Sequence, residues 1–402
     1  MIKSFLRKLL PHRQVPRSDG FIDVKELIAS VDLQTHLERA DAYFRDMSIN
    51  SDELRKPFMG SEAVRLVPVL GAVLSHLEFY KGIRILDFGC GTGWLSQSLA
   101  LMGARVFAVD ASDRALRLAK QYTLSKYPEL EGCIEYVVFN GTKIAVHDGS
   151  IDRIVCMDSF HHVPNQATVL AEFSRILAKD GRVVFAEPGE HHSASAESQQ
   201  AMRQFGVIEN DIVLADIWPI AQRVGFDSMK VAAYAPAPLL SLAEFESLRR
   251  PSSRTMRRLY DEVYFPLNSG SRLFVLGKAE ASRDSRFREG LSCKLSATVH
   301  QEGPILCITL VARNTGSSVW RQSGGEPGCV NAGLILHRQD GTWDYEFQRE
   351  EFLRSCLPPG EEVSFSVRVR KDAIGPHELY ADLVAEHVTW MGQNDQPPIR
   401  LL

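Results

Sequence analysis

The stretch RILDFGCGTGWLS, residues 84–96, constrains the fold of this 402-residue chain more than any other part of its sequence. Its first apolar residues, 85–88, are typical of a short buried strand, because turn-forming glycines follow them directly. Glycines lack Cβ atoms, so the backbone here can turn sharply and approach a ligand closely. From Trp94 onward the apolar spacing is helical. The glycines therefore lie at a strand-to-helix junction, where open α/β sheets bind nucleotide-like ligands.

The spacing of the glycines bears on the identity of the ligand. A dinucleotide-binding loop follows the pattern G-x-G-x-x-G, but here the third glycine comes one residue early, at Gly93, and Trp94 follows it. A second predicted strand, residues 106–109, ends in Asp110. A carboxylate there can accept hydrogen bonds from both hydroxyls of an adenosine ribose. The alternative is an ordinary Gly-rich turn and a surface acid.

Five residues of this region together resemble the first motifs of class I methyltransferases, which use S-adenosylmethionine (SAM). They are Asp87, Gly89, Gly91, Gly93 and Asp110. The resemblance implies an α/β fold with a doubly wound, seven-stranded methyltransferase sheet. It also implies a SAM site formed by Asp87, Gly89, Cys90, Gly91, Gly93, Asp110, Ala111, Asn140, Gly141 and Asp158.

Asn140 follows the third predicted strand, residues 133–139, at a position where related methyltransferases usually have Asp. Its amide oxygen can still accept a hydrogen bond from the adenine amino group, although without a charge. The alternative is that Asn140 is only a turn-forming residue ahead of Gly141.

Histidines and acids follow two neighbouring strands, predicted at residues 153–157 and 183–186. Methyl transfer to a hydroxyl depends on positioning and gains from a general base. We predict His161 or His162 as that base, because imidazole titrates near neutrality. Asp158 or Glu187 would orient the base or bind the acceptor. The alternative is that the histidines only pack beside the cofactor.

A divalent metal held by Asp158, Glu187 and either His191 or His192 is a second alternative, but the spacing matches no specific ligand motif. We therefore predict a site without metal.

Composition narrows the class of protein. Hydrophobic residues make up 45% and charged residues 24% of the chain, as in ordinary globular proteins. The net charge of −4 gives no electrostatic support for a nucleic-acid partner. The 7 cysteines are scattered without a C-x-x-C pair, which favours reduced thiols and a cytoplasmic location. No apolar run approaches the roughly 20 residues of a membrane span.

The N-terminal residues form a predicted basic amphipathic helix. Residues 1–10 have apolar side chains on one helical face and basic ones opposite, and further basic residues follow up to position 17. Residues 1–17 are thus a candidate contact to the inner face of a membrane. A helix docked on the protein's own core, or a frayed terminus, would give the same pattern.

The length of the chain predicts more than one domain. Residues 1–59 are helical in pattern and are expected to form a lid over the cofactor, with Tyr43, Phe58 and Met59 as candidate contacts. Core packing would explain these three residues equally well. Residues 60–280 would form the methyltransferase domain. In it we expect a turn at Gly181, a substrate-side loop followed by a helix within residues 198–226, and an acceptor-shaping insertion at about 238–270.

In residues 290–402 the apolar residues recur with a period of two, which predicts an antiparallel β-sandwich. The segments 314–320, 357–361, 375–376 and 382–390 resemble those of immunoglobulin-like domains attached to bacterial proteins of surface-polysaccharide assembly. The side chains that could stack on sugar rings are Trp320, His337, Trp343 and Trp390; burial within the sandwich is the alternative for Trp320 and Trp390.

The resemblances together predict a SAM-dependent methyltransferase acting on a hydroxyl of a sugar or glycan intermediate. Two rivals stay open: a small-molecule methyltransferase whose sandwich serves assembly, and a non-catalytic protein that keeps the cofactor pocket as a scaffold.

Overall fold

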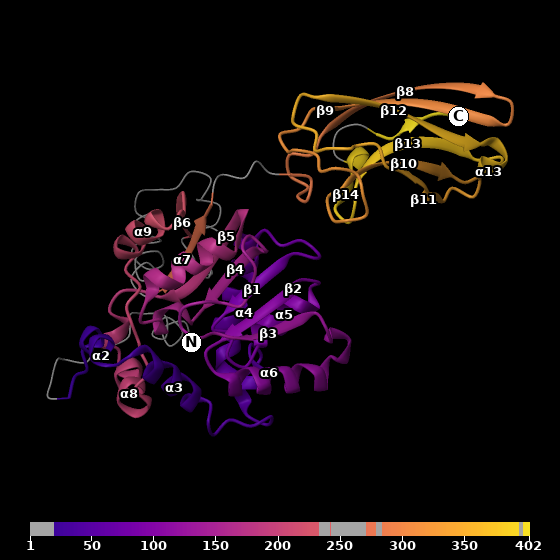
Figure 1. Cartoon of the computed structure of the whole chain (residues 1–402). Helices are drawn as coiled ribbons and strands as arrows, with labels where there is room; N and C mark the ends of the chain where they lie inside the picture. The colour runs from indigo at the N-terminus through magenta and orange to yellow at the C-terminus, as the bar shows by residue number, and fades with distance from the viewer. Residues whose placement is uncertain (1–19, 233–241, 243–270, 279–283, 394–396) are drawn as a thin grey trace. The chain divides into compact units, whose positions relative to one another are not determined.

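A computed structural model describes residues 20–232, 242, 271–278, 284–393 and 397–402 (Figure 1). The chain divides into two compact units, Met1–Glu280 and Ala281–Leu402. The predicted membrane contact at residues 1–17 lies outside the described residues, as does the insertion at 238–270 apart from residue 242. No helix among the described residues is long and apolar enough to cross a bilayer.

The described strands of the first unit form one sheet in the order β3-β2-β1-β4-β5-β7-β6. Neighbouring strands from β3 to β5 pair in parallel, whereas β7 pairs antiparallel with both β5 and β6. The bounds are β1 Arg84–Phe88, β2 Arg105–Asp110, β3 Ile134–Val138, β4 Ile151–Met157, β5 Leu177–Pro188, β6 Ser228–Ala232 and β7 Ser271–Gly277. Strand order reverses between β1 and β4, and such a reversal opens a ligand crevice at the carboxyl ends of the strands.

Helices cover both faces of this sheet, as expected for a doubly wound fold. Neighbouring residues of β1 point to opposite faces: Leu86 packs with α7 and α9, and Ile85 packs with α4 and α5. The bounds are α4 Ala63–Leu77, α5 Trp94–Leu101, α6 Asp113–Lys126, α7 Gln166–Ile176, α8 Ala196–Phe205 and α9 Leu214–Arg223. Burial on both faces explains why β1 reads as a continuous apolar run broken only by Asp87.

Two local predictions in this unit are wrong. The turn expected at Gly181 lies inside β5, which begins at Leu177 and shifts register against β4. The expected substrate-side loop contains helix α8. Ser195 caps this helix by accepting from the Ser198 N–H, and Gly206 ends it in the left-handed conformation.

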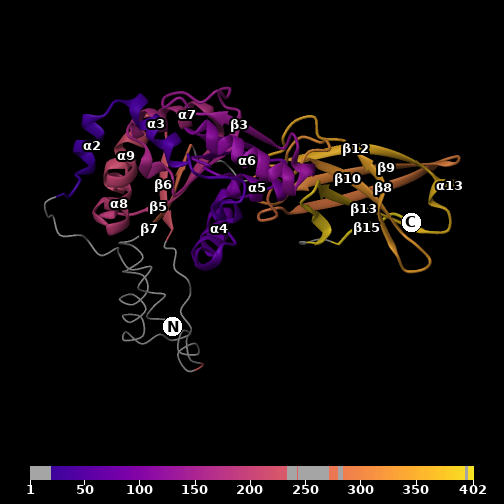
Figure 2. The ribbon, with the colours of Figure 1, turned by 90° about the horizontal axis from the view of Figure 1, so that it is seen from below.

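The N-terminal helices lie beside the sheet edge that carries the site. α2 spans Val24–Ser30 and α3 spans Leu33–Tyr43; Asp23 and Asp32 cap them. Helix α3 contacts α6 and α8, and both ribbon views show it next to α8 (Figure 1 and Figure 2). This segment therefore has the position expected of a cover.

The three candidate lid contacts differ in their surroundings. The Tyr43 ring packs edge-on against Phe44 and Phe205. Phe58 is 79% exposed, and Met59 precedes a short 3-10 turn. The helical pattern does not tell whether Tyr43, the last residue of α3, or Phe44, its C-cap, packs toward the glycine loop. Sequence alone therefore did not single out Phe44.

The second unit contains two antiparallel sheets, with strand orders β11-β10-β13-β14 (β15 also pairs β13) and β12-β9-β8. Inward residues of both sheets share one core, which includes Leu310 and Leu334. The bounds are β8 Cys293–Glu302, β9 Ile305–Asn314, β10 Val330–His337, β11 Trp343–Glu350, β12 Glu362–Arg370, β13 Glu378–Ala385, β14 Thr389–Trp390 and β15 Ile399–Arg400.

The tryptophans of this unit differ in exposure. Trp320 is fully buried. Trp390 lies under the Arg349 guanidinium, 4.5 Å from the ring centroid. Trp343 is 42% exposed and stacks on His337 with centroids 4.4 Å apart. Trp343 and His337 thus remain accessible for stacking, whereas Trp320 is a core residue.

Candidate active site

The glycine loop joins β1 to α5 and is held against the end of β2. The Gly89 N–H donates to the Val109 carbonyl at 2.8 Å. Gly89 has φ +68°, and a Cβ atom added there would lie 2.4 Å from the Ser159 Cβ. Gly93 has φ +78°, and a Cβ atom added there would lie 2.8 Å from the Ala119 Cβ. Both positions therefore require glycine for close packing as well as for the turn.

Asp110 at the end of β2 fastens the glycine loop. One carboxylate oxygen accepts from the Gly91 N–H and the other from the Ser112 N–H, each at 2.8 Å. Burial raises the pKa of Asp110, and hydrogen bonds from the backbone, including that of Ala111, oppose the rise. Each oxygen keeps a lone pair, so this carboxylate can still accept from two hydroxyls.

Asp87 is 2% exposed and accepts a hydrogen bond from the Ser96 hydroxyl at 2.6 Å. Burial raises the pKa of Asp87 to about 7. The neighbouring Cys90 is buried against Ala108 and Leu116, and burial raises the pKa of its thiol well above the ordinary value. The backbone of Cys90 is thus part of the glycine loop, whereas its side chain packs in the core.

Asn140 serves the turn after β3. Its amide oxygen accepts from the N–H groups of Thr142 and Lys143 at 3.0 and 2.8 Å, and from the Thr142 hydroxyl at 3.1 Å. The carbonyl of Gly141 accepts from the Asn165 amide at 2.8 Å. Because three local donors face the amide oxygen, the geometry favours the turn-forming interpretation over adenine recognition.

The N-terminal segment covers the tips of β1 and β2. A Cβ on Gly91 would lie 3.7 Å from the Phe44 ring. Asp41 on α3 accepts from the Ser112 hydroxyl at 2.6 Å. Thus Phe44 and Asp41, neither of which was predicted from the sequence, fasten this cover to the loop that holds Asp110.

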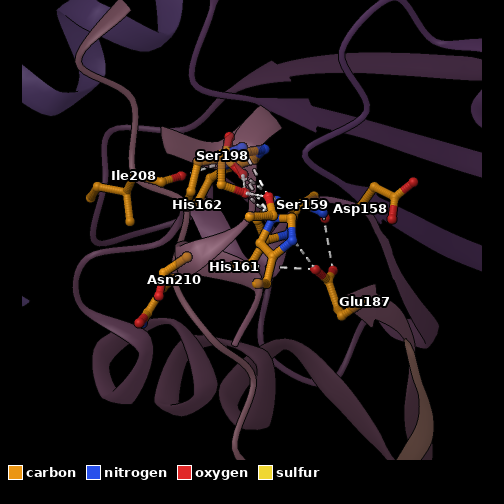
Figure 3. Close-up of polar contacts among 12 residues, drawn as sticks. Asp158, Ser159, His161, His162, Glu187, Ser198, Ile208 and Asn210 are labelled. Carbon is orange, nitrogen blue, oxygen red and sulfur yellow. Dashed lines mark hydrogen bonds and ion pairs between the residues drawn. The ribbon is translucent and has the colours of Figure 1, made fainter. Parts of the chain in front are cut away.

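The ends of β4 and β5 bring His161 and Glu187 together (Figure 3). His161 is 4% exposed, and its Nδ1 lies 2.7 Å from Glu187 Oε2. The other oxygen of Glu187 accepts from the N–H groups of Ser159 and Phe160 at 3.0 and 2.8 Å. Burial raises the pKa of Glu187 to about 7 and, helped by the charge of His162, lowers the pKa of His161 well below its ordinary value.

Asp158 and His162 lie at the edge of this pair. The Asp158 carboxylate pairs with Arg65 at 2.7 Å and points away from His161 (Figure 3). Loss of solvent around the Asp158 carboxylate raises its pKa, but the charge and hydrogen bond of the Arg65 guanidinium outweigh this effect and hold the pKa below its usual range. His162 is exposed, and its Nδ1 donates to the Ile208 carbonyl at 2.6 Å.

Glu209, between α8 and α9, faces the histidines. It accepts from His192 Nε2 at 2.8 Å and from the Ser198 hydroxyl at 3.3 Å, and it lies 3.7 Å from His161 Nε2. Burial raises the pKa of Glu209, but the His192 hydrogen bond and the charges of the histidines lower it to about 2. Sequence reasoning missed this residue, and the one available signal was its place in a run of polar residues, 209–211, between apolar neighbours.

The metal ligands considered from the sequence do not form a group among the described residues. Asp158 is paired with Arg65, Glu187 is used by His161, and His191 is exposed. A different set has ligand atoms within 4.8 Å of one another: His161, His162 and Glu209.

Comparison with known proteins assigns the class of the central part of the first unit. Residues 86–185 match the methyltransferase domain family. The matched segment runs from β1 to β5 and contains the glycine loop, Asp110 and the His161–Glu187 pair. This part of the chain is therefore a methyltransferase domain, and its cofactor is SAM, as predicted.

Curated relatives are ubiquinone biosynthesis O-methyltransferases. That of Photobacterium profundum is 33% identical over 118 residues, which are 29% of this chain and 48% of the relative. That of Burkholderia vietnamiensis is 35% identical over 132 residues, which are 33% of this chain and 53% of the relative. The chain thus spans about half the length of these relatives.

Among solved structures, geranyl diphosphate methyltransferase in complex with GPP and sinefungin matches with a TM-score of 0.43 at 15% identity, covering 61% of this chain and 100% of that one. Phosphoethanolamine N-methyltransferase 2 of Haemonchus contortus in complex with SAM matches with a TM-score of 0.39 at 17% identity, covering 65% and 61%.

Proposed function

We propose that this chain is a SAM-dependent O-methyltransferase that acts on a hydroxyl group of a small-molecule acceptor. The observation that carries the proposal is the buried His161–Glu187 pair beside the glycine loop. Ser159 links the two features: its N–H donates to Glu187 at 3.0 Å, its hydroxyl donates to the Phe88 carbonyl at 2.7 Å, and its side chain packs on Gly89. A base and a cofactor loop therefore share one edge of the sheet.

The residues of the loop fit SAM. Positions 89, 91 and 93 of the loop carry no side chain, so a ligand can approach the backbone there closely. Asp110 is the buried acceptor for the ribose hydroxyls, and the buried Asp87 supplies a second carboxyl group near a cofactor that carries positive charge. When bound, SAM supplies an activated methyl group with a neutral leaving group.

His161 removes the acceptor proton in this proposal. Glu187 accepts the Nδ1 proton, which leaves Nε2 as the unprotonated nitrogen. Burial keeps the imidazole neutral before reaction. The acceptor hydroxyl gives its proton to Nε2 as its oxygen bonds to the methyl carbon, and the Glu187 carboxylate stabilises the imidazolium that results.

The acceptor class is supported by the curated relatives, which are named O-methyltransferases. A phenolic hydroxyl of a small aromatic molecule is the first candidate. A sugar or glycan hydroxyl, the acceptor predicted from the sequence, is the second candidate, and its support is the exposed Trp343 stacked on His337 in the second unit.

The test is methyl transfer from labelled SAM by the full chain, with small phenols and small saccharides supplied separately. We expect S-adenosylhomocysteine to form with one acceptor class, and His161→Asn to slow product formation without weakening SAM binding. Failure to bind SAM, or equal rates with and without every acceptor, would refute the proposal.

A further inference from the structure

We infer that His161, His162 and Glu209 form a binding site for a divalent transition-metal ion of the zinc class. This metal binding rests on the described residues alone and does not depend on the proposed function.

The donor atoms have the separations that one ion requires. His161 Nε2 lies 3.7 Å from Glu209 Oε2, and His162 Nδ1 lies 3.8 Å from Glu209 Oε1. Both distances are too long for hydrogen bonds. Two ligands that each lie about 2.0–2.2 Å from one ion are about 3–4 Å apart. The two imidazoles thus face the two oxygens of one carboxylate across a gap of suitable size.

An outer shell already orients the principal ligand. Zinc-binding histidines usually donate their second nitrogen to a carboxylate, which fixes the tautomer. Glu187 does this for His161, because its Oε2 lies 2.7 Å from Nδ1 (Figure 3). The other ring nitrogen, Nε2, lies 3.7 Å from Glu209 Oε2. The Asn210 N–H donates to the His161 carbonyl at 3.0 Å, which fastens the Glu209 segment to the histidine turn.

His162 completes the set with one rearrangement. Its Nδ1 donates to the Ile208 carbonyl at 2.6 Å. Metal binding exchanges this hydrogen bond for a metal bond, or turns the exposed ring so that Nε2 faces the ion. Either change is local, because the side chain of His162 is 44% exposed.

The charge of the cluster calls for a cation. Glu209 is buried, and its ion pairs among the described residues are made with histidines and with no Lys or Arg. A buried carboxylate among neutral imidazoles is costly. Either one imidazole holds a proton, with His192 at 2.8 Å the nearest, or a metal ion supplies the charge. These two states are what the experiment separates.

The donor set indicates the kind of metal. Two histidines and one glutamate with an open position form a catalytic type of zinc site. Mg²⁺ prefers oxygen ligands and should bind poorly.

A second group of potential ligands, His300, Glu302 and Cys307 in the second unit, is less suitable. It lies at the surface, and Glu302 already pairs with His300 and Arg368, each at 3.1 Å. The test must nevertheless separate it from the first group.

The experiment is a Zn²⁺ titration by calorimetry of the full chain after treatment with a chelator, with metal content measured on the same samples. Three variants are titrated in parallel: Glu209→Gln, Cys307→Ser and the control His191→Asn. His191 is exposed and has φ +67°, which Asn tolerates. SAM binding and circular dichroism on each sample report whether the fold is intact.

We expect one Zn²⁺ per chain, retained by His191→Asn and Cys307→Ser and weakened more than about 100-fold by Glu209→Gln, since outer-shell partners alone are worth 10–100-fold. Binding that Glu209→Gln leaves unchanged, binding lost only in Cys307→Ser, or no stoichiometric binding would overturn the inference. If Glu209→Gln fails to fold, the exposed His162→Ala takes its place with the same expectation. Absent zinc binding with intact SAM binding refutes the metal site alone, whereas absent SAM binding refutes the proposed function.

Discussion

Replacing Glu187 by Gln should reverse the tautomer of His161. The carboxylate oxygen that faces His161 Nδ1 at 2.7 Å would become an NH₂ group. Nδ1 would then have to accept, and the ring proton would move to Nε2, 3.7 Å from Glu209. An imidazole protonated at Nε2 can neither take the acceptor proton nor bind a metal there.

The size of the effect follows from these contacts. Loss of a correctly oriented general base should slow methyl transfer by roughly 10²–10⁴-fold. The amide retains an oxygen for the N–H groups of Ser159 and Phe160 but loses a charged hydrogen bond to His161, so the free energy of unfolding should fall by about 1.5–3 kcal/mol. SAM affinity should stay within a few-fold, because the hydrogen bonds of the Glu187 carboxylate within the described part of the chain go to residues 159–161 and not to the glycine loop.

The pH dependence has a definite sign. The pKa of Glu187 is raised from 4.5 to about 7, so its stabilising contribution is present below pH 4.5 and is lost as pH rises through about 7. Activity follows the opposite trend, because the base needs an ionised Glu187. Methyl transfer by the wild-type chain should therefore increase as pH rises through about 7, and Glu187→Gln should lack this step.

The assay is single-turnover methyl transfer across pH, with chemical unfolding of the same samples. Glu172→Gln is the matched control, because Glu172 is also a buried acid that accepts a backbone N–H, that of Ile144 at 2.7 Å, on a helix away from the site. Glu172→Gln should lose stability and keep the rate and its pH step. A Glu187→Gln variant with the wild-type rate and pH profile would refute the argument.

Three further predictions concern the loop and its surroundings. Gly89→Ala should lower the free energy of unfolding by about 2–5 kcal/mol, because φ is +68° and the new Cβ would lie 2.4 Å from the Ser159 Cβ. The control Gly132→Ala, with φ +79° but open space around the new Cβ, should lower it by only about 1–2 kcal/mol. Chemical denaturation measures both changes. Asp110→Asn should raise the Kd for SAM by roughly 10- to 150-fold, the worth of a hydrogen bond to a charged group, and an unchanged Kd in calorimetry would contradict the ribose role. Arg65→Met should raise the pKa of Asp158 toward its ordinary value in an NMR titration while changing stability by less than about 1 kcal/mol, because the ion pair is half-exposed.

The part of the site carried by the parallel strands could be predicted from the sequence. The carboxyl ends of neighbouring parallel strands meet at one edge, so residues that follow β1, β2, β4 and β5 must lie close together. This reasoning found the glycine loop, Asp110, His161 and Glu187. It worked because the distance between these residues is set by backbone pairing instead of by side-chain packing.

Residues brought in by the surrounding helices could not be predicted in the same way. Glu209 reaches the histidines because α8 and the segment after it dock on the N-terminal residues, as when the Gln199 amide donates to the Ile22 carbonyl at 2.9 Å. Phe44 reaches the loop because α3 packs across α6 and α8. Such contacts depend on tertiary packing between distant segments, and no local period encodes them.

The irregular parts of the site illustrate the same limit. Asn140 has a side chain that suits both a turn and a ligand, and only the positions of Thr142 and Lys143 decide between the two roles. In the sequence, Asp158 and Glu187 are both acids that follow a predicted strand. In the structure, the Asp158 carboxylate instead accepts from Arg65 on α4, 93 positions away.

Calorimetry of the full chain with SAM and with S-adenosylhomocysteine tests the central claim most directly. The glycine loop fastened by Asp110 should bind one molecule of either compound per chain, and the heat should fall sharply in Asp110→Asn. Absence of binding by both compounds to the folded chain would contradict the account.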